Sequence, residues 1–303
     1  MSRPIIIDCD PGIDDALAIM LAIASNELDI KLITTCAGNQ RIEKITLNTL
    51  KLLSFVDKEI EVAKGADKPL FKDLVLSEAA HGKSGFGEVE LEEVKFSVSD
   101  RSAIEAMKDT ILNSEQKITI VAIGPLTNIA LLIKSYPEVI KNINQLSIMG
   151  GACNGGNCTP VAEFNIYVDP DAAKIVFDSG IPITMFGLDV THQIPMYKED
   201  IDRIRYIGNK TGQFAAKMLD FYFKEDKIEG MHDPCPVAYL IDPSLFTIIP
   251  CNVEIETKGE FTRGQTVVDK LNQTGKPQNV KVALEVEREK ILDMLYNAIK
   301  KLK

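Results

Sequence analysis

The stretch Pro4-Ile5-Ile6-Ile7-Asp8-Cys9-Asp10-Pro11-Gly12-Ile13-Asp14-Asp15-Ala16-Leu17-Ala18 contains the transition that decides the fold. Its three consecutive isoleucines predict a strand that is buried on both faces, as strands of parallel sheets are. From Asp14 to Ala24, apolar residues recur at helical spacing, and two aspartates occupy the first turn, where negative charge suits the helix dipole. A buried strand that runs directly into a helix indicates the start of a βαβ unit.

The same alternation of strands and helices continues along the chain. Strands are expected at residues 4–7, 30–35, 60–63, 117–123, 145–149, 181–186, 253–257 and 280–285. Helices are expected at residues 14–24, 42–55, 127–134, 170–178, 201–207, 211–224 and from Arg288 to the end. This order predicts an α/β fold, a mostly parallel, open twisted sheet of the Rossmann type flanked by helices. Without internal repeats or a linker, we expect a single domain over residues 1–303.

Two stretches interrupt the alternation. Residues 65–100 are long and mixed in composition, and residues 150–165 are rich in glycine and asparagine. Loops of this length within a compact domain are usually functional or disordered.

The 303 residues carry 34 basic and 44 acidic side chains, a formal net charge of −10. This balance argues against nucleic acid or an anionic membrane as a partner and suits a protein that holds a divalent cation. The beginning of the chain lacks the apolar run of a signal peptide, and no segment approaches the ~20 apolar residues of a membrane span. The six scattered cysteines are interpreted as reduced thiols, so we expect a cytoplasmic protein.

Four carboxylates, at Asp8, Asp10, Asp14 and Asp15, lie within eight residues. Packed this closely, they would raise one another's pKa unless a cation neutralised them. Carboxylate oxygens are hard ligands, so Ca²⁺ or Mg²⁺ is favoured over zinc. The spacing does not fit an EF-hand loop. A phosphatase with a strand-end aspartate nucleophile remains an alternative, although Pro11-Gly12 fits it poorly.

Polar residues and glycines also follow the other expected strands. In an open parallel sheet, ligands bind beyond the carboxyl ends of the strands, so these segments should meet at one edge. The set suits a ligand with many hydroxyl groups, such as a sugar. The segments are Gly38-Asn39, Gly124-Pro125-Leu126-Thr127-Asn128, Met149-Gly150-Gly151 and Asp189 to His192.

Taken together, these motifs resemble the nucleoside hydrolase family of the inosine-uridine preferring type, essentially from end to end. The resemblance rests on Asp8 to Asp15, Ala37-Gly38-Asn39, Gly124 to Ala130, Met149-Gly150-Gly151, Ala162-Glu163-Phe164-Asn165, Gly187 to His192 and His232-Asp233-Pro234-Cys235. It implies an enzyme that hydrolyses the N-glycosidic bond of ribonucleosides with one bound Ca²⁺, and a homo-oligomer, dimer or tetramer.

The resemblance also implies a role for each matching residue. The calcium ligands would be Asp10, Asp15, Asp233 and the backbone carbonyl of Ile123. Asp10 would also deprotonate the attacking water, whose pKa the cation lowers. Ribose would be held by Asp14, Asn39, Asn157, Glu163 and Asn165, with Met149 near the ring.

The base would be protonated by His232, whose unperturbed pKa near ~6.5 suits a proton donor. His81 matches a family position near the base, although a surface role is an equal alternative for it. Phe164 and Tyr222 could stack on the base, and His192 is interpreted as a structural hydrogen-bonding residue. The segment Lys224–Met231, which closes over the base in the family, brings no aromatic residue before His232.

Two other functions stay open from the residues. One is a nucleoside or ribose sensor that binds without turnover. The other is the Mg²⁺-dependent phosphatase that uses the strand-end aspartates.

Overall fold

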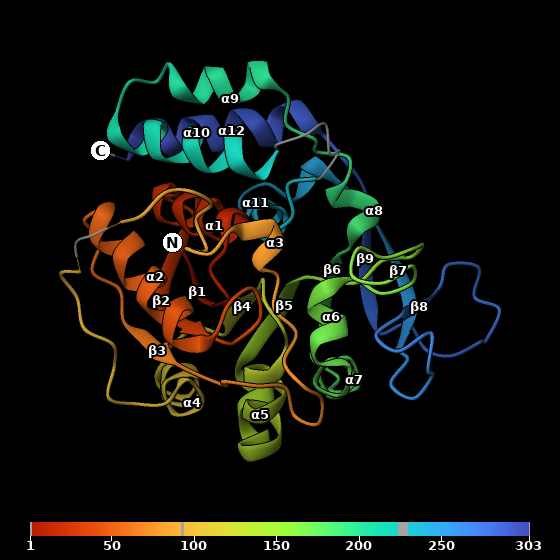
Figure 1. Ribbon diagram of the computed structural model, residues 1–303. Helices are drawn as coiled ribbons and strands as arrows, with labels where there is room; N and C mark the ends of the chain where they lie inside the picture. The colour runs from red at the N-terminus through yellow and green to blue at the C-terminus, as the bar shows by residue number, and fades with distance from the viewer. Residues whose placement is uncertain (1, 92–93, 224–229, 303) are drawn as a thin grey trace.

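The strand and helix quoted above form the centre of the molecule. In the computed structural model, which describes residues 2–91, 94–223 and 230–302, β1 (Arg3–Cys9) leads into α1 (Ile13–Ala24) (Figure 1). β1 is buried almost throughout and pairs in parallel with β2 (Leu28–Thr35) and β4 (Ile118–Ala122), one on each side. β1 is therefore an inner strand of the sheet. Its side chains point alternately to the two faces, Ile5 and Ile7 into one hydrophobic core and Ile6 into the other.

Within the described residues, nine strands form one sheet in the order β3-β2-β1-β4-β5-β6-β9-β7-β8. The strands not yet introduced are β3 (Val62–Lys64), β5 (Ile143–Met149), β6 (Ile183–Phe186), β7 (Phe246–Ile255), β8 (Thr266–Asp269) and β9 (Val280–Val286). Only the pairings of β7, with β9 and with β8, are antiparallel. The strand order reverses at β1, so the carboxyl ends of β1 and β4 mark the switch point where such sheets bind ligands.

Helices cover both faces of this sheet, and a hydrophobic core lies on each side (Figure 1). The first face carries α1, α2 (Ile42–Phe55), α10 (Lys210–Tyr222), α11 (Pro234–Ile241) and α12 (Arg288–Lys301), with α9 (Lys198–Arg205) packed outside α10 and α12. The second face carries α4 (Ala103–Asn113), α5 (Thr127–Ser135), α7 (Pro170–Phe177) and the 3₁₀ helix η1 (Pro137–Asn142). The remaining short elements are α3 (Glu78–His81), α6 (Phe164–Val168), α8 (Leu188–Thr191) and η2 (Pro243–Leu245).

The predicted α/β architecture is confirmed, and the expected elements agree with the observed ones to within a few residues, apart from β7, which begins at Phe246. The elements that were not predicted include two longer helices, α4 and α11, and the edge strand β8. α4 has a capping box in which Ser102 and Glu105 bond each other, a signal that the sequence contains. α11 begins with Pro234 and Pro236, which read as a loop but are tolerated in the first turn of a helix. β8 is a four-residue edge strand, too short to show a period.

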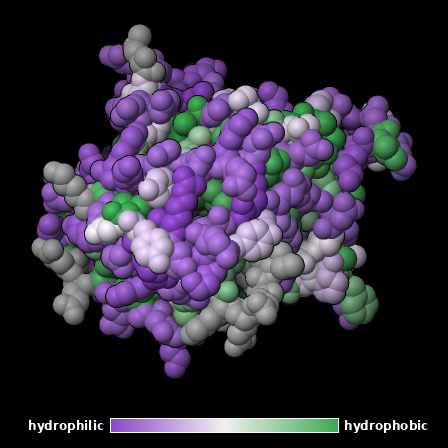
Figure 2. Space-filling view, turned by 90° about the horizontal axis from the view of Figure 1, so that it is seen from above, coloured by the Kyte–Doolittle hydropathy of each residue, from purple (hydrophilic) through white to green (hydrophobic). Residues whose placement is uncertain are grey.

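The outer helices present a polar surface. Figure 2 shows the molecule from the side of α9 and α10, where hydrophilic side chains predominate and hydrophobic ones form small separate areas. None of the helices in the described residues has the length and apolar character that crossing a bilayer requires.

Candidate functional site

The side chain of Asp10 lies at the switch point, between the ends of β2 and β4. Two glycines make room for it: a Cβ on Gly38 would lie 2.1 Å from Oδ2 of Asp10, and a Cβ on Gly124 would lie 2.6 Å from Oδ1. The backbone N–H of Asn39 donates to Oδ2 at 2.8 Å. Oδ1 is buried and has no hydrogen-bond partner among the described residues. The two strand-end glycines therefore form a cradle for a carboxylate with one unused oxygen.

Asp15 holds the turn between β1 and α1 together. Its carboxylate accepts hydrogen bonds from the backbone N–H groups of Gly12, at 2.9 Å, and Asp10, at 3.2 Å. The side-chain amide of Asn39 also donates to it, at 3.3 Å. Backbone donors at the start of a helix favour an anion there, which explains how the chain tolerates this buried acid.

Asp233, which directly precedes α11, completes a group of acids. Ligand oxygens of Asp14, Asp15 and Asp233 all lie within 4.8 Å of one another, and all three residues are buried. Burial, together with repulsion from neighbouring carboxylates, raises the pKa of Asp10 and of Asp233 well above the ordinary value, and raises that of Asp15 to about 7. Oδ1 of Asp14 is a second buried oxygen without a hydrogen-bond partner among the described residues, although Nδ1 of His81 lies 3.9 Å from it. Buried carboxylates this close together can all be ionised in the folded protein only if a cation is bound among them.

A cavity of about 300 Å³ opens above these carboxylates. Asp10 and Asp15 lie beneath it, fully buried, while every other residue predicted for the site lies on its wall. Those wall residues are Asp14, Asn39, His81, Ile123, Met149, Asn157, Glu163, Phe164, Asn165, Tyr222, His232 and Asp233. The structure thus brings together residues from eight separate segments, as expected for the carboxyl edge of a parallel sheet.

One side of the cavity is formed by the start of α6. Glu163 caps this helix, accepting from the N–H groups of Asn165, at 2.9 Å, and Ile166, at 3.2 Å. The amide of Asn165 donates to the backbone carbonyls of Ile123 and Met149, at 3.1 and 3.2 Å. Asn157, which is exposed, accepts from the N–H of Phe164 at 2.9 Å. This side therefore offers both donors and acceptors at fixed positions.

His81 forms another part of the wall, and here the surface alternative is wrong. His81 ends α3 and is buried, its Nδ1 accepting the backbone N–H of Ile13 at 3.1 Å. Its ring stacks on Tyr222, with the ring centres 5.6 Å apart. Burial lowers the pKa of His81, so the ring is neutral at pH 7. The long segment after β3 thus reaches back to the turn after β1.

His232 lies on the cavity wall with its Nδ1 2.7 Å from Oγ1 of Thr191. Burial lowers its pKa to about 4, so the unperturbed value assumed from the sequence does not hold in the folded protein. The ring of His192, which was interpreted from the sequence as a structural hydrogen-bonding group, also lies on the wall, with its centre 5.6 Å from that of the His232 ring.

Asp8 does not join the cavity, although the sequence grouped it with the other acids. Its Oδ1 accepts from Thr34, at 2.6 Å, and from Asn128, at 2.8 Å. The sequence also missed the wall residues Val75 to Ser77, Ala79, Ala80 and Cys158, for which loop length was the one available signal. Residues 224–229 of the segment expected to close over the base lie outside the described residues.

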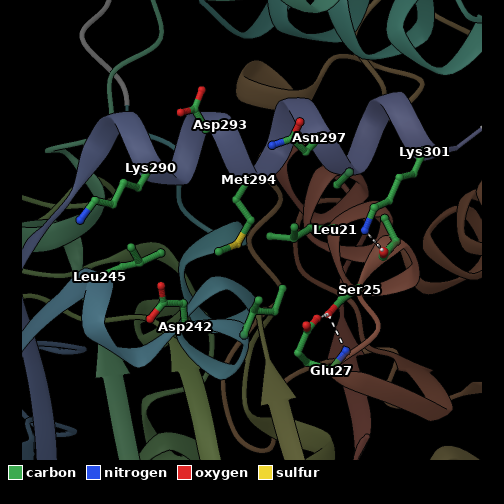
Figure 3. A pocket seen from close by; sticks show the side chains of 13 residues that line it. Leu21, Ser25, Glu27, Asp242, Leu245, Lys290, Asp293, Met294, Asn297 and Lys301 are labelled. Carbon is green, nitrogen blue, oxygen red and sulfur yellow. Dashed lines mark hydrogen bonds between the residues drawn. The ribbon is translucent and has the colours of Figure 1, made fainter.

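A second cavity, of about 340 Å³, lies between α1, α11 and α12 (Figure 3). Leu21 and Met294 point into it, while Lys290, Asp293 and Asn297 are spread along α12 rather than directed at one point. Among the described residues, none of the buried side-chain oxygens that lack a hydrogen-bond partner belongs to a residue lining this cavity. The carboxylate cavity is therefore the better candidate for a site, despite its smaller volume.

Fold and cavity define a class of protein: an open α/β sheet whose carboxyl edge offers buried hard oxygens for a cation and a ring of polar groups for a hydroxyl-rich ligand. Comparison with known proteins identifies the family. The model of the inosine-uridine preferring nucleoside hydrolases matches residues 5–293. The pyrimidine-specific ribonucleoside hydrolase RihA of Escherichia coli (strain SMS-3-5 / SECEC) is 47% identical over 308 residues, covering 99% of each chain.

Solved structures agree. A purine-preferring ribonucleoside hydrolase from Gardnerella vaginalis superposes with a TM-score of 0.92 at 34% identity, and a plant nucleoside hydrolase, PpNRh1, with a TM-score of 0.92 at 33% identity. Each comparison covers 99% of both chains. The chain belongs to the inosine-uridine preferring nucleoside hydrolase family. It is thus an enzyme of the class that cleaves the N-glycosidic bond of nucleosides, in a metal-dependent family, and its buried aspartates fit that dependence.

Proposed function

We propose that this enzyme hydrolyses ribonucleosides to ribose and free base with a Ca²⁺ ion held by Asp10, Asp15, Asp233 and the carbonyl of Ile123. The observation that carries the proposal is the buried carboxylate group, in which Oδ1 of Asp10 and Oδ1 of Asp14 lack hydrogen-bond partners among the described residues. Hard oxygen donors suit Ca²⁺, whose irregular coordination tolerates a mixed set of carboxylate and carbonyl ligands. When bound, the cation supplies positive charge that lowers the pKa of a neighbouring water.

In the proposed reaction, Asp10 accepts a proton from the water that attacks the anomeric carbon of ribose. The bond from that carbon to the base nitrogen breaks, its electron pair leaves with the base, and the configuration inverts. The transition state is oxocarbenium-like, as for other glycosides. Glu163 and Asn165, which the contacts at the start of α6 hold in position, would bind ribose hydroxyls along with Asp14, Asn39, Asn157 and Met149. Bonds that tighten as positive charge develops would stabilise the transition state selectively.

The base would lie between His81, Tyr222 and Phe164, with His232 bonded to it. Because burial lowers the pKa of His232 to about 4, its ring is neutral at pH 7 and acts first as an N–H donor. Transfer of its proton becomes favourable only as the departing base gains negative charge. We expect pyrimidine nucleosides to be preferred, since the 47% identical relative is named pyrimidine-specific.

The phosphatase alternative is not supported by the cavity. Its described lining contains carboxylates and histidines but no lysine or arginine, so a phosphate ester would meet negative charge without a cationic side chain to balance it. The sensor alternative requires a site that has lost its catalytic groups, whereas Asp10, Asp15 and Asp233 are present and assembled.

The test is free ribose released from inosine, uridine, cytidine, adenosine and guanosine by metal-free protein and after Ca²⁺ is restored. Release that requires Ca²⁺ supports the proposal, and the ranking gives the base preference. Binding without release would favour the sensor. Light scattering would test the expected dimer or tetramer, and cell fractionation the expected cytoplasmic location.

A further inference from the structure

The hydroxyl of Thr191 makes an unusual contact with the cavity wall. Thr191 is the last residue of α8 and is fully buried, and its Oγ1 lies 2.7 Å from Nδ1 of His232. In the described residues this is the sole hydrogen bond that either side chain makes. A threonine near the end of a helix commonly forms a hydrogen bond with a carbonyl of its own helix. The hydroxyl of Thr191 instead bonds a histidine 41 positions later in the chain.

The backbone on either side of this contact is also joined. The N–H of Met231 donates to the carbonyl of Ile194 at 3.0 Å, and Pro195 pairs with Gly230 in an antiparallel bridge. A Cβ on Gly230 would lie 2.0 Å from the carbonyl oxygen of Thr191, so only glycine permits this approach. The segment after α8 therefore holds the main chain that leads into His232, and the Thr191 hydroxyl holds its ring.

Ring orientation matters because the outer torsion of a histidine has two broad wells about 180° apart. Rotation between them exchanges Nδ1 with a carbon and moves Nε2 away from its position. With Nδ1 on Thr191, Nε2 is left without a partner among the described residues, and it is not one of the fully enclosed partnerless atoms. Since His232 lines the cavity, Nε2 is the nitrogen that a ligand can reach.

We propose that Thr191 is a positioning residue, whose hydroxyl selects the ring orientation in which His232 presents Nε2 to the leaving base. The inference rests on the proposed role of His232 in that reaction. Thr191 itself touches neither substrate nor cation: it is not part of the cavity wall. Loss of the Thr191 hydroxyl should therefore lower kcat for substrates whose leaving base needs a proton and should leave the binding of ribose unchanged.

The first test compares Thr191→Val, which keeps the shape and removes the hydroxyl, with Thr191→Ser, which restores a hydroxyl. With Ca²⁺ present, T191V should lower kcat on uridine by about 10- to 100-fold, a part of the usual contribution of a general acid, while KM changes little. On p-nitrophenyl riboside, whose leaving group needs no proton, the loss should stay below about 3-fold, and T191S should recover most of the uridine rate. Equal losses on both substrates, or none on uridine, would overturn the inference.

Thr49→Val is the matched control, because Thr49 is also fully buried and its hydroxyl bonds only the carbonyl of Ile45 within α2. It should leave both rates unchanged. If it reproduces the T191V pattern, the pattern reflects general damage to the fold and the inference fails.

A second measurement does not depend on turnover. The chain has three histidines, so ¹⁵N-labelled histidine gives a spectrum that His232→Ala can assign. T191V should shift the ring nitrogens of His232 and leave those of His81 in place, whereas an unchanged His232 signal would overturn the inference. If the shift is seen but the wild-type enzyme releases no ribose, the proposed function has failed and the positioning contact stands.

Discussion

The backbone N–H of Asn39 donates to Oδ2 of Asp10 at 2.8 Å, and Oδ1 of the same carboxylate is left buried with no partner in the described part of the chain. One oxygen is thus fixed by the protein and the other is available to a ligand. The hydrogen bond on Oδ2 sets the direction in which Oδ1 points, and Gly38 and Gly124 leave the room that this carboxylate occupies. This geometry underlies the first prediction.

Asp10→Asn should abolish turnover while keeping the shape of the site. The amide oxygen can still accept from Asn39, but the side chain loses its charge and its capacity to accept a proton, so we expect a loss of more than about 10³-fold in kcat. Ribose release measures it. Asp29→Asn is the control: this carboxylate, on neighbouring β2, is partly exposed and pairs with Lys31, so the variant should retain full activity. Turnover of D10N near that of the wild type would remove Asp10 from both proposed roles.

His232→Ala should slow substrates in proportion to how poor their leaving group is. We expect losses of about 10²- to 10⁴-fold on uridine or inosine, the usual range for a general acid, and far less on p-nitrophenyl riboside. The ratio of kcat between the two substrates is the measurement, since it cancels damage to the ribose site. A ratio unchanged from the wild type would mean that His232 does not assist the leaving base.

Calcium should stabilise the protein more at high pH than at low pH. Burial, then repulsion from Asp14, raises the pKa of Asp15 from 3.8 to about 7, so between these values the folded metal-free protein binds a proton that the unfolded chain has released. The free energy of unfolding of the metal-free protein therefore falls as the pH rises through this window. Calcium needs the ionised carboxylate and competes with that proton.

The measurement is the rise in melting temperature when Ca²⁺ is added to metal-free protein across this pH range. The rise should grow from about pH 5 to about pH 8, and Asp233→Asn should reduce it. A rise that is constant with pH, or larger at low pH, would contradict the assignment of these carboxylates as ligands.

Asn128→Ala should destabilise the fold beneath the site. The amide of Asn128 donates to Asp8 at 2.8 Å and to the carbonyl of Thr35 at 3.0 Å, and its oxygen accepts from the N–H of Ala66 at 2.9 Å. Removing a fully buried amide that satisfies three groups should cost about 2–4 kcal/mol in urea unfolding. Asn144→Ala, which removes one 3.3 Å contact at the surface, should cost less than about 1 kcal/mol. Equal effects would show that the network contributes little.

Local sequence patterns were sufficient to predict the fold class and the acidic residues at the bottom of the cavity. A continuous apolar run revealed β1, and apolar residues at helical spacing revealed α1, although the fold buries that helix on all sides from Ile13 to Ala22. The acids after β1 pointed to a hard cation because their chemistry does not depend on distant partners. Even here the structure separated Asp8, which bonds Thr34 and Asn128, from the acids of the cavity.

From the sequence by itself came the βαβ alternation, the acidic turn after β1 and, through the family motifs, most residues of the cavity wall. The tertiary structure alone decided which side chains meet. His81 accepts the N–H of a residue 68 positions earlier, and Thr191 holds a histidine 41 positions later. The pKa of His232 was likewise invisible, since burial sets it. Periodicity and motif spacing describe a chain locally, whereas hydrogen-bond partners and desolvation depend on what the fold places around each group.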